Sequence, residues 1–185
     1  MRLLSVNIGG LRAIDHEGVR IVTGIYKLPI EGRRPVGRLG VDGDVQADSD
    51  HHGGPDRAVY AYSVEDYRWF GPTFTPGQFG ENLTIEGVES AAVCVGDRLQ
   101  IGGVLLEVTA PRIPCRKLAI KMGEVAFVQR FWAARRFGFY LRVVETGELG
   151  AGDAIRYIRS QPRGMTIPAA AQAYLDARVA REKLG

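Results

Sequence analysis

The sequence predicts a mainly β protein with short helices, an α+β fold whose strands form a closed or nearly closed β-barrel followed by a C-terminal helix. Short segments of alternating or β-branched residues recur along the chain, glycine turns separate them, and brief helical segments interrupt them. A chain of 185 residues suits one domain with an appendage. We therefore expect a barrel domain over residues 1–160 and a helical extension over residues 161–185.

The first two predicted strands cover residues 2–9 and 19–27. The segment RLLSVNIG alternates as a strand does, and VRIVTGIYK follows a His-Glu-Gly turn, so we expect the two segments to pair as a hairpin. Residues 35–58 contain too many glycine and acidic residues for a helix and predict a loop. The strand pattern resumes with VYAY at residues 59–62.

A short helix is predicted over residues 63–70. Ser63 suits its N-cap, acidic residues fill its first turn, and a Gly-Pro pair ends it. Residues 76–88 turn through two glycines and then extend as a strand. Within them, Asn82 suits a turn by residue type, with a ligand contact as the alternative.

The clearest strand signal in the chain covers residues 95–111. Apolar and polar residues alternate on both sides of a Gly-Gly pair, which predicts a tight hairpin. Val104, Leu106 and Val108 would share one face of the second strand. That strand leads directly to Cys115, which therefore lies at the strand's carboxyl end.

Two helices are predicted after this strand, over residues 117–123 and 124–136. In the longer one, the spacing of Phe127, Phe131 and Ala134 is typical of core packing.

The remaining chain predicts two more strands joined by turns in residues 137–158, and then an alanine-rich helix in residues 167–185. Because the sequence offers this helix no partner helix, we expect it to pack on the barrel or on another subunit, as a homodimer would allow.

The motif PRIPCRKL at residues 111–118 carries the strongest chemical signal. Its prolines fix the backbone on both sides and hold Cys115 on a rigid corner. Arg112, Arg116 and Lys117 surround the thiol, and nearby positive charge favours the thiolate, which can attack an electrophile, carry sulfur or bind a soft metal. The alternative is a buried cysteine that acts as a small hydrophobic residue, but the flanking cations argue against full burial.

The other cysteine, Cys94, lies among small apolar residues and is predicted to belong to the core. In a reducing compartment we expect no disulfide between Cys94 and Cys115.

The segment HHGGPDR at residues 51–57 places two imidazoles before Gly53 and Gly54, whose backbone amides can approach an anionic ligand closely. The one other histidine is His16, so the adjacent pair has no partners for a tetrahedral zinc site. At most one of the pair points inward, and we favour His52 because it adjoins the glycines. The alternative is that both are solvated loop residues.

Charge and hydropathy exclude several classes of function. The formal net charge is +3 and no run of like charges is dense, so we expect small anions as partners and no nucleic-acid polymer. No apolar run approaches the length of a membrane span, and the N-terminus lacks a signal-peptide pattern, so we expect no membrane association and a cytoplasmic location. The phosphate-binding loop, the dinucleotide fingerprint and the Gly-x-Ser-x-Gly elbow are missing.

Three blocks of the chain together resemble the MOSC family, named for the C-terminal domain of molybdenum cofactor sulfurases. They begin with GRLGVDGD…HHGGPDRA at residue 37, continue with FGENLTIEGV and VGDRLQIG, and end with PRIPCRKL and the later GFYLRV. The ordered set HHGGPDRA, FGEN and PRIPC is highly specific. The resemblance covers about residues 3–159 and looks closest to small stand-alone bacterial members linked to resistance against N-hydroxylated purine bases.

This resemblance implies a MOSC-type β-barrel that binds a molybdopterin-type molybdenum cofactor. It implies an oxidoreductase that reduces N-hydroxylated bases or related N-oxygenated compounds, with electrons from a separate donor protein. By motif, Cys115 would be the catalytic cysteine and the molybdenum ligand. His52, Asn82, Arg112 and Lys117 would line the cofactor pocket. The cofactor phosphate needs cations and backbone amides, which Arg57, Arg112, Arg116, Lys117, Gly53 and Gly54 could supply.

Two other functions remain open, since a fold does not fix a function. One is a sulfur carrier or sulfurtransferase that uses a Cys115 persulfide, and the other is a non-catalytic module that binds the cofactor. Pyridoxal phosphate is not expected, because that chemistry belongs to a separate large domain of full-length sulfurases. In stand-alone relatives a module of about three helices often follows the barrel, whereas this chain has one predicted helix there.

Overall fold

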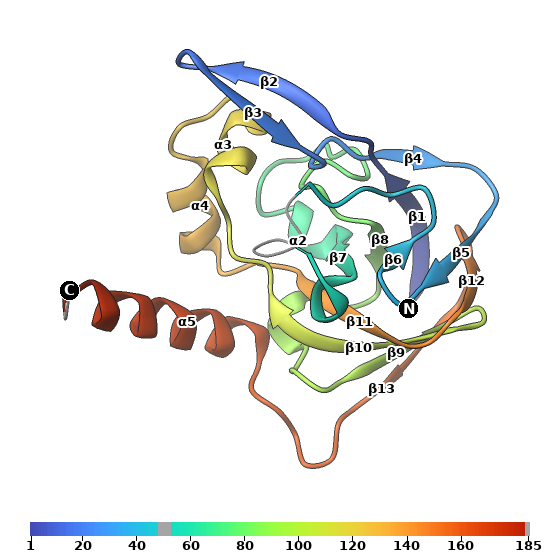
Figure 1. Ribbon diagram of the computed structural model, residues 1–185. Helices are drawn as coiled ribbons and strands as arrows, with labels where there is room; N and C mark the ends of the chain where they lie inside the picture. Colours follow the sequence, from blue (N-terminus) through green and yellow to red (C-terminus); the bar gives the residue numbers. More distant parts are fainter. Residues whose placement is uncertain (48–52, 184–185) are drawn as a thin grey trace.

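The computed structural model describes residues 1–47 and 53–183. Its main feature is an eight-stranded sheet in the order β13-β9-β10-β11-β7-β8-β1-β4, which curves around the centre of the molecule (Figure 1). The strands of this sheet are β1 (Arg2–Ile8), β4 (Leu28–Ile30), β7 (Val59–Ser63), β8 (Leu83–Glu86), β9 (Arg98–Ile101), β10 (Val104–Pro111), β11 (Phe139–Glu145) and β13 (Ile155–Ile158). The predicted α+β class with mostly sheet is confirmed.

The sheet does not close into a barrel within the described residues, because its strand order ends at β13 on one side and β4 on the other. The two ends of the sheet approach each other where residues 1–3 contact residues 152–155, and Ile155 N of β13 donates to Met1 O at 3.0 Å. Leu3 N donates to Asp153 O at 2.9 Å, and Gly152 N donates to Leu3 O at 2.8 Å. A single bridge between Arg2 and Ala154 replaces a ladder. Of the predicted closed or nearly closed β-barrel, the closed form is therefore not confirmed.

Two smaller sheets flank the large one. One contains β12 (Gly147–Gly150), β5 (Arg33–Gly37) and β6 (Gly40–Val41), and the other is the hairpin of β2 (Arg12–His16) and β3 (Val19–Thr23).

The predicted hairpin between residues 2–9 and 19–27 is wrong. β3 pairs with β2 instead, across a two-residue turn in which Glu17 and Gly18 both have positive φ, of 53° and 76°. This backbone geometry matches the twist of a tight hairpin and selects the nearer strand as the partner. β1 pairs with β4 and β8.

The hairpin predicted at residues 95–111 is confirmed as β9 and β10, with Val104 opposite Ile101. Val104, Leu106 and Val108 are all buried, so the predicted apolar face lies in the core. β10 then runs towards the Cys115 corner.

The helices are α2 (Val64–Tyr67), α3 (Arg116–Met122), α4 (Phe127–Ala134) and α5 (Ile167–Glu182), with 3₁₀ turns η1 (Pro55–Arg57) and η2 (Ser90–Ala92). Ser63 caps α2 as predicted, since its hydroxyl accepts a hydrogen bond from Asp66 N at 3.2 Å. Gly123 ends α3 in the left-handed conformation, with φ 65°.

Aromatic side chains fill the space between the helices and the sheet. Phe127 and Phe131 of α4 are fully buried, which confirms the core role that their spacing predicts. Both rings lie 5.5 Å from that of Phe79, which also contacts Tyr62 of β7 at 5.0 Å between centroids. This cluster fixes α4 and the loop before β8 against the sheet, and so positions one wall of the pocket described below.

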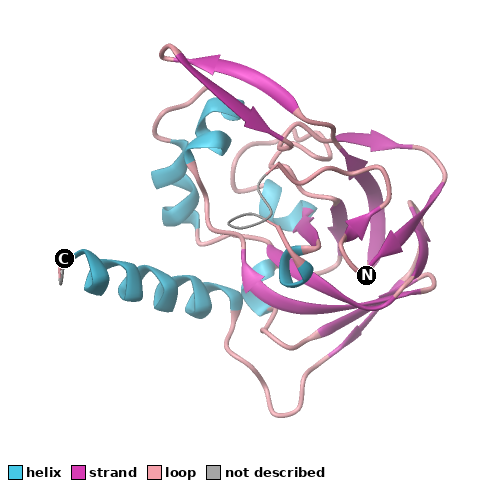
Figure 2. Cartoon of the chain, in the orientation of Figure 1, coloured by secondary structure: helices cyan, strands magenta, loops and turns pink. Residues whose placement is uncertain are grey.

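α5 confirms the predicted C-terminal helix. Thr166 caps it by accepting a hydrogen bond from Ala169 N at 3.3 Å, and Ile167 and Ala171 are its buried residues. The first turns pack near β10 and η2, and the rest of the helix projects from the body (Figures 1 and 2).

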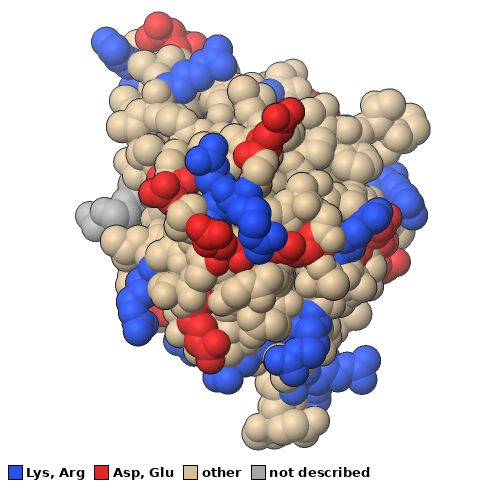
Figure 3. Space-filling view, turned by 90° about the vertical axis from the view of Figure 1, so that its right-hand side faces the viewer, with Lys and Arg blue, Asp and Glu red and all other residues tan. Residues whose placement is uncertain are grey.

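Charged side chains of both signs are interspersed on the face shown in Figure 3. No helix among the described residues is long and apolar enough to cross a membrane.

Candidate functional site

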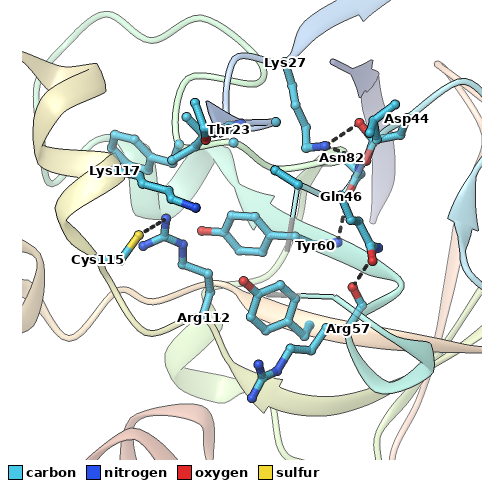
Figure 4. Close-up of a pocket in the computed structure, with 17 residues that line it drawn as sticks. Thr23, Lys27, Asp44, Gln46, Arg57, Tyr60, Asn82, Arg112, Cys115 and Lys117 are labelled. Atoms are coloured by element: carbon cyan, nitrogen blue, oxygen red, sulfur yellow. Dashed lines mark hydrogen bonds and ion pairs between the residues drawn. The ribbon is translucent and has the colours of Figure 1, made fainter. Parts of the chain in front are cut away.

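Cys115 lies in a pocket formed by the end of β10, the start of α3 and three loops (Figure 4). The empty space within the pocket and at its mouth amounts to about 640 Å³. The residues that line it are Thr23, Gly24, Ile25, Lys27, Asp44, Val45, Gln46, Ala47, Arg57, Tyr60, Phe79, Gly80, Asn82, Arg112, Cys115, Lys117 and Tyr140.

Cys115 is half-buried and stands in the N-cap position of α3, with an extended backbone (φ −132°). The proline before it keeps Ile113 out of the helical region, and Cys115 is itself extended, so α3 starts directly after the cysteine. The thiol therefore sits on the corner that the sequence predicts, and the pocket leaves it accessible.

Arg112 is the cation next to this thiol. Its Nη2 lies 3.9 Å from Cys115 Sγ, and its Nη1 donates to Ile113 O at 3.1 Å. Only 5% of Arg112 is exposed, so the protein keeps a charged guanidinium away from water at the pocket. Burial lowers the pKa of Arg112, but the interaction with the Cys115 thiolate opposes that effect, and the net direction is upward.

Two tyrosines form an aromatic wall beside Arg112. The ring of Tyr60 on β7 lies 5.4 Å from the ring of Tyr140 on β11, and the two residues are directly opposite each other in the sheet. The Arg112 guanidinium carbon lies 5.9 Å from the centroid of Tyr60, and that of Arg57 lies 5.9 Å from the centroid of Tyr140. Both distances are within the range of cation–π contacts.

An ion pair between Lys27 and Asp44 forms the opposite wall (Figure 4). The two side chains are 8% and 5% exposed. Asp44 also accepts hydrogen bonds from Gly9 N at 2.9 Å and from Asn82 Nδ2 at 2.8 Å. Burial lowers the pKa of Lys27, and Asp44 opposes this shift. The carboxylate thus has a donor for several of its lone pairs, as a buried charge requires.

Asn82 connects this network to the sheet. Its Oδ1 accepts from Tyr60 N at 3.1 Å, while its Nδ2 donates to Asn7 O at 3.3 Å as well as to Asp44. Asn82 is 4% exposed and lines the pocket. Its side chain therefore holds the pocket wall together, which differs from the local turn role that its residue type suggests.

The glycine of the FGEN segment is required by close packing. Gly80 has φ 84°, and a Cβ atom there would lie 2.6 Å from Ile25 Cγ1. The next residue, Glu81, is fully buried and accepts hydrogen bonds from Gly77 N at 2.7 Å and Phe79 N at 3.1 Å. Glu81 thus stabilises the loop before β8, and Gly80 lets that loop pack against Ile25. Both segments line the pocket.

Lys121, one turn further along α3, secures the same two loops from behind. Its Nζ donates to Ile25 O at 2.8 Å and to Gly77 O at 2.7 Å. Burial lowers the pKa of Lys121 to about 8, with Glu81 opposing the shift and Lys27 adding to it.

The structure brings together Cys115, Arg57, Asn82, Arg112 and Lys117 from the predicted site residues, all of which line the pocket.

Three other predicted residues lie close to or outside this group. Gly53 and Gly54 precede η1, next to Arg57, and Gly54 N donates to Gln46 Oε1 at 3.2 Å. Arg116 is not in the pocket lining; it is exposed and pairs with Glu17 at 2.9 Å.

The predicted histidine, His52, lies outside the described residues, as does its neighbour His51. Among residues 1–47 and 53–183, no group of three His, Cys, Asp or Glu side chains could hold a metal ion on its own.

Sequence reasoning missed Lys27, Asp44, Tyr60, Lys121 and Tyr140. Tyr60 and Tyr140 lie in segments that the sequence predicts as strands, and their places in those strands were the sequence signal that could have drawn attention to them. The ion pair joins residues 17 positions apart through loops without periodicity, and nothing in the sequence marks the two as partners.

Cys94 is 2% exposed, which confirms its predicted place in the core, and neither cysteine is in a disulfide. Its Sγ accepts from Arg163 Nη2 at 2.9 Å. Cys94 is not among the residues that line the Cys115 pocket.

Comparison with known proteins agrees with these motifs. The family model described as "MOSC domain" matches residues 48–156. The protein YflK of Bacillus subtilis (strain 168) is 34% identical over 169 residues, which are 89% of this chain and 76% of YflK. The chain belongs to the MOSC domain family.

This MOSC protein is also similar to proteins named YiiM from two bacteria. The protein YiiM of Escherichia coli (strain K12) is 33% identical over 155 residues, 80% of this chain and 68% of YiiM. The crystal structure of YiiM from Geobacillus stearothermophilus superposes with a TM-score of 0.75 at 28% identity, covering 94% of this chain and 83% of that one.

A protein named "Reductase" from Gibberella moniliformis is 36% identical over 161 residues, which are 83% of this chain but 28% of the fungal protein. The MOSC chain therefore corresponds to a minor part of that longer protein.

Proposed function

We propose that this MOSC protein binds a molybdopterin-type cofactor, with the Cys115 thiolate as a molybdenum ligand, and reduces N-hydroxylated bases or related N-oxygenated compounds. The observation that carries the proposal is the buried Arg112 guanidinium 3.9 Å from the Cys115 thiol inside an open pocket. The reductase name of the fungal relative and the MOSC family itself support the class of reaction.

The residues present fit such a cofactor. Molybdenum accepts soft sulfur ligands, and Cys115 presents its sulfur to the pocket on a rigid corner. A single protein ligand suffices, because the cofactor brings its own donor atoms. The site therefore needs no cluster of metal-binding side chains.

The charges of the pocket fit the cofactor's phosphate. Arg112 cannot lose its proton in a protein, and a buried guanidinium without an anion is costly, so the Cys115 thiolate beside it would complete its environment. Arg57 and Lys117 line the same pocket and add two further cations. Lys27 is already neutralised by Asp44 and contributes mainly to the shape of the wall.

In this proposal, each group of the chain has a separate task. Cys115 binds the metal, Arg112 favours its thiolate, and Arg57 and Lys117 hold the phosphate. Asn82 and Asp44 keep the wall in place. The bound cofactor would supply two electrons to the nitrogen–oxygen bond of the substrate, and a separate redox protein would restore them.

The decisive experiment is metal analysis together with pterin fluorescence of protein made in a host that synthesises the cofactor. We expect molybdenum and pterin in the wild type, and a loss of bound molybdenum and of turnover in Cys115→Ser, with the fold intact by circular dichroism. Cys94→Ser is the matched control and should mainly lower thermal stability. Unchanged molybdenum in Cys115→Ser would reject the ligand role, and an inactive Cys94→Ser with active Cys115→Ser would move the site.

A second function, sulfur transfer by a Cys115 persulfide, is favoured by the half-buried position of the thiol at an open pocket. The two functions compete for one sulfur atom. A metal ligand should react slowly with alkylating reagents in loaded protein, whereas a carrier should alkylate rapidly and gain one sulfur mass from a cysteine desulfurase. A stoichiometric persulfide that passes to an acceptor, with no reductase turnover in loaded protein, would make this protein a transferase.

A further inference from the structure

We infer that Tyr140 is the proton donor to the departing oxygen of the N-hydroxylated substrate, an inference that rests on the proposed function. Tyr140 lies on β11, in the interior of the sheet, and its side chain lines the pocket together with Cys115.

The tyrosines buried around the pocket and core already use their hydroxyl groups as donors. Tyr60 Oη donates to Phe137 O at 3.2 Å and Tyr62 Oη donates to Arg136 O at 2.8 Å. Tyr67 Oη donates to the buried carboxylate Glu81 at 2.6 Å. These three groups have structural roles and no donor capacity left for a ligand.

Tyr140 differs from them. Within residues 1–47 and 53–183, its hydroxyl group makes no hydrogen bond to the protein, although its backbone oxygen accepts one from Thr109 Oγ1 at 3.2 Å. The residue is half-buried in the pocket lining, so the hydroxyl group remains accessible to a ligand there. A donor left open in an otherwise satisfied aromatic wall is available for an acceptor atom of the substrate.

The position of this hydroxyl group is fixed in advance. Tyr140 pairs with Tyr60 on one side and Ala110 on the other, and its ring contacts the Tyr60 ring and the Arg57 guanidinium. Ladder pairing on both sides and ring contacts restrict the side chain to a narrow range of orientations. Such preorganisation is what proton transfer to a bound substrate requires.

The electrostatic surroundings suit a donor. Burial raises the pKa of Tyr140, a thiolate at Cys115 adds to that shift, and the cations Arg112 and Arg57 oppose it. The phenol therefore carries its proton at neutral pH, while the two guanidinium groups can stabilise the phenolate that forms when the proton leaves.

The balanced reaction shows where this proton goes. An N-hydroxylated amine takes up two electrons and two protons, its N–O bond breaks, and the products are the amine and water. The two electrons come from the reduced cofactor of the proposed function. Tyr140 gives one proton to the departing hydroxyl oxygen, which leaves as water, and solvent supplies the proton on nitrogen and then reprotonates the phenolate.

The first test compares Tyr140→Phe with the wild type as full-length, cofactor-loaded protein, using an N-hydroxylated purine and an artificial electron donor. We expect unchanged molybdenum content, a loss of about 10²- to 10³-fold in kcat, and a much smaller change in KM. Tyr62→Phe is the matched control, because it deletes a structural hydroxyl group on the neighbouring strand β7, and its kcat should stay within about twofold of the wild type.

A second measurement does not depend on turnover. In protein labelled with ¹³C at the tyrosine ζ carbon and loaded with cofactor, but without an electron donor, the Tyr140 resonance should shift when the N-hydroxylated purine binds. The same resonance should be missing in Tyr140→Phe. An unshifted Tyr140 signal with bound purine, or an unchanged kcat in Tyr140→Phe alongside an active wild type, would overturn this inference alone. A loaded wild type that does not reduce any N-hydroxylated compound would instead overturn the proposed function.

Discussion

Arg112 and Cys115 are three residues apart, and a guanidinium nitrogen of the first lies 3.9 Å from the sulfur of the second. The arginine is 5% exposed and the cysteine half-buried, so little water separates or screens their charges. The corner between β10 and α3 therefore couples the thiol to a permanent cation.

This coupling predicts the reactivity of the thiol. In Arg112→Gln, loss of the cation should raise the pKa of Cys115 by one unit or more, because an adjacent opposite charge typically changes a pKa by about 1 to 3 units. The rate of alkylation at pH 7 should fall about tenfold, and its midpoint should move to higher pH. Arg116→Gln removes a cation that pairs with Glu17 outside the pocket, and should leave the profile unchanged. Identical profiles for wild type and Arg112→Gln would contradict the coupling.

The second prediction separates two neighbouring cations. Lys117 lines the pocket and Arg116 does not, although they follow each other in the chain. If Lys117 binds the cofactor phosphate, Lys117→Ala should weaken cofactor binding by about one to two orders of magnitude, as expected for the loss of a charge-assisted hydrogen bond of roughly 1.5 to 3 kcal/mol. Arg116→Ala should retain wild-type affinity. Pterin content after dialysis measures both, and equal losses would place the phosphate elsewhere.

The third prediction concerns the buried ion pair of Lys27 and Asp44. Asp44→Asn leaves the Lys27 ammonium without its carboxylate, and we expect a loss of about 3 to 5 kcal/mol in the free energy of unfolding. The control is Glu86→Gln, which breaks the exposed pair with Arg2 and should cost less than about 1 kcal/mol. Urea unfolding measures both variants. A similar small loss in the two would show that Lys27 finds another partner or water.

The fourth prediction is a pH dependence that arises from Lys121. Burial lowers its pKa to about 8 in the folded protein, below its ordinary value of 10.5. Between these values the unfolded chain binds more protons than the folded protein, so the contribution of Lys121 to stability rises with pH, by roughly 2 to 3 kcal/mol at most. Below pH 8 the charged group contributes its full unfavourable burial.

The measurement for Lys121 is urea unfolding of wild type and Lys121→Met from pH 7 to 10.5. The difference between the two free energies should rise in favour of the wild type as pH increases, while other titrating groups cancel. Lys183→Met, at the exposed C-cap position that follows α5, is the control for loss of a lysine. A constant difference over this range would show that Lys121 does not change its protonation on folding.

Local patterns in the sequence predicted much of the fold. The hairpin of β9 and β10, the capped helix α2 and the apolar face of α4 all follow from periodicity and capping residues near each other in the chain. These signals are reliable because they depend on interactions within a few residues.

The closure of the sheet and the partner of β1 could not be predicted in this way. The tight turn at Glu17 and Gly18 pairs β3 with β2, and β1 then takes strands from later in the chain. β1 pairs with β4 about 20 positions away and with β8 more than 70 positions away, and alternation alone gives no register for either pairing.

The sequence by itself determined that a cysteine stands on a proline-fixed corner at the end of a strand, surrounded by cations and within the motifs of the MOSC family. Only the tertiary structure decided which cations face it. Arg116 and Lys117 begin the same helix and point about 100° apart, so one pairs at the surface and the other lines the pocket. Likewise, the open hydroxyl group of Tyr140 and the Lys27–Asp44 pair exist because distant segments pack together, and packing between distant segments has no local signature in the chain.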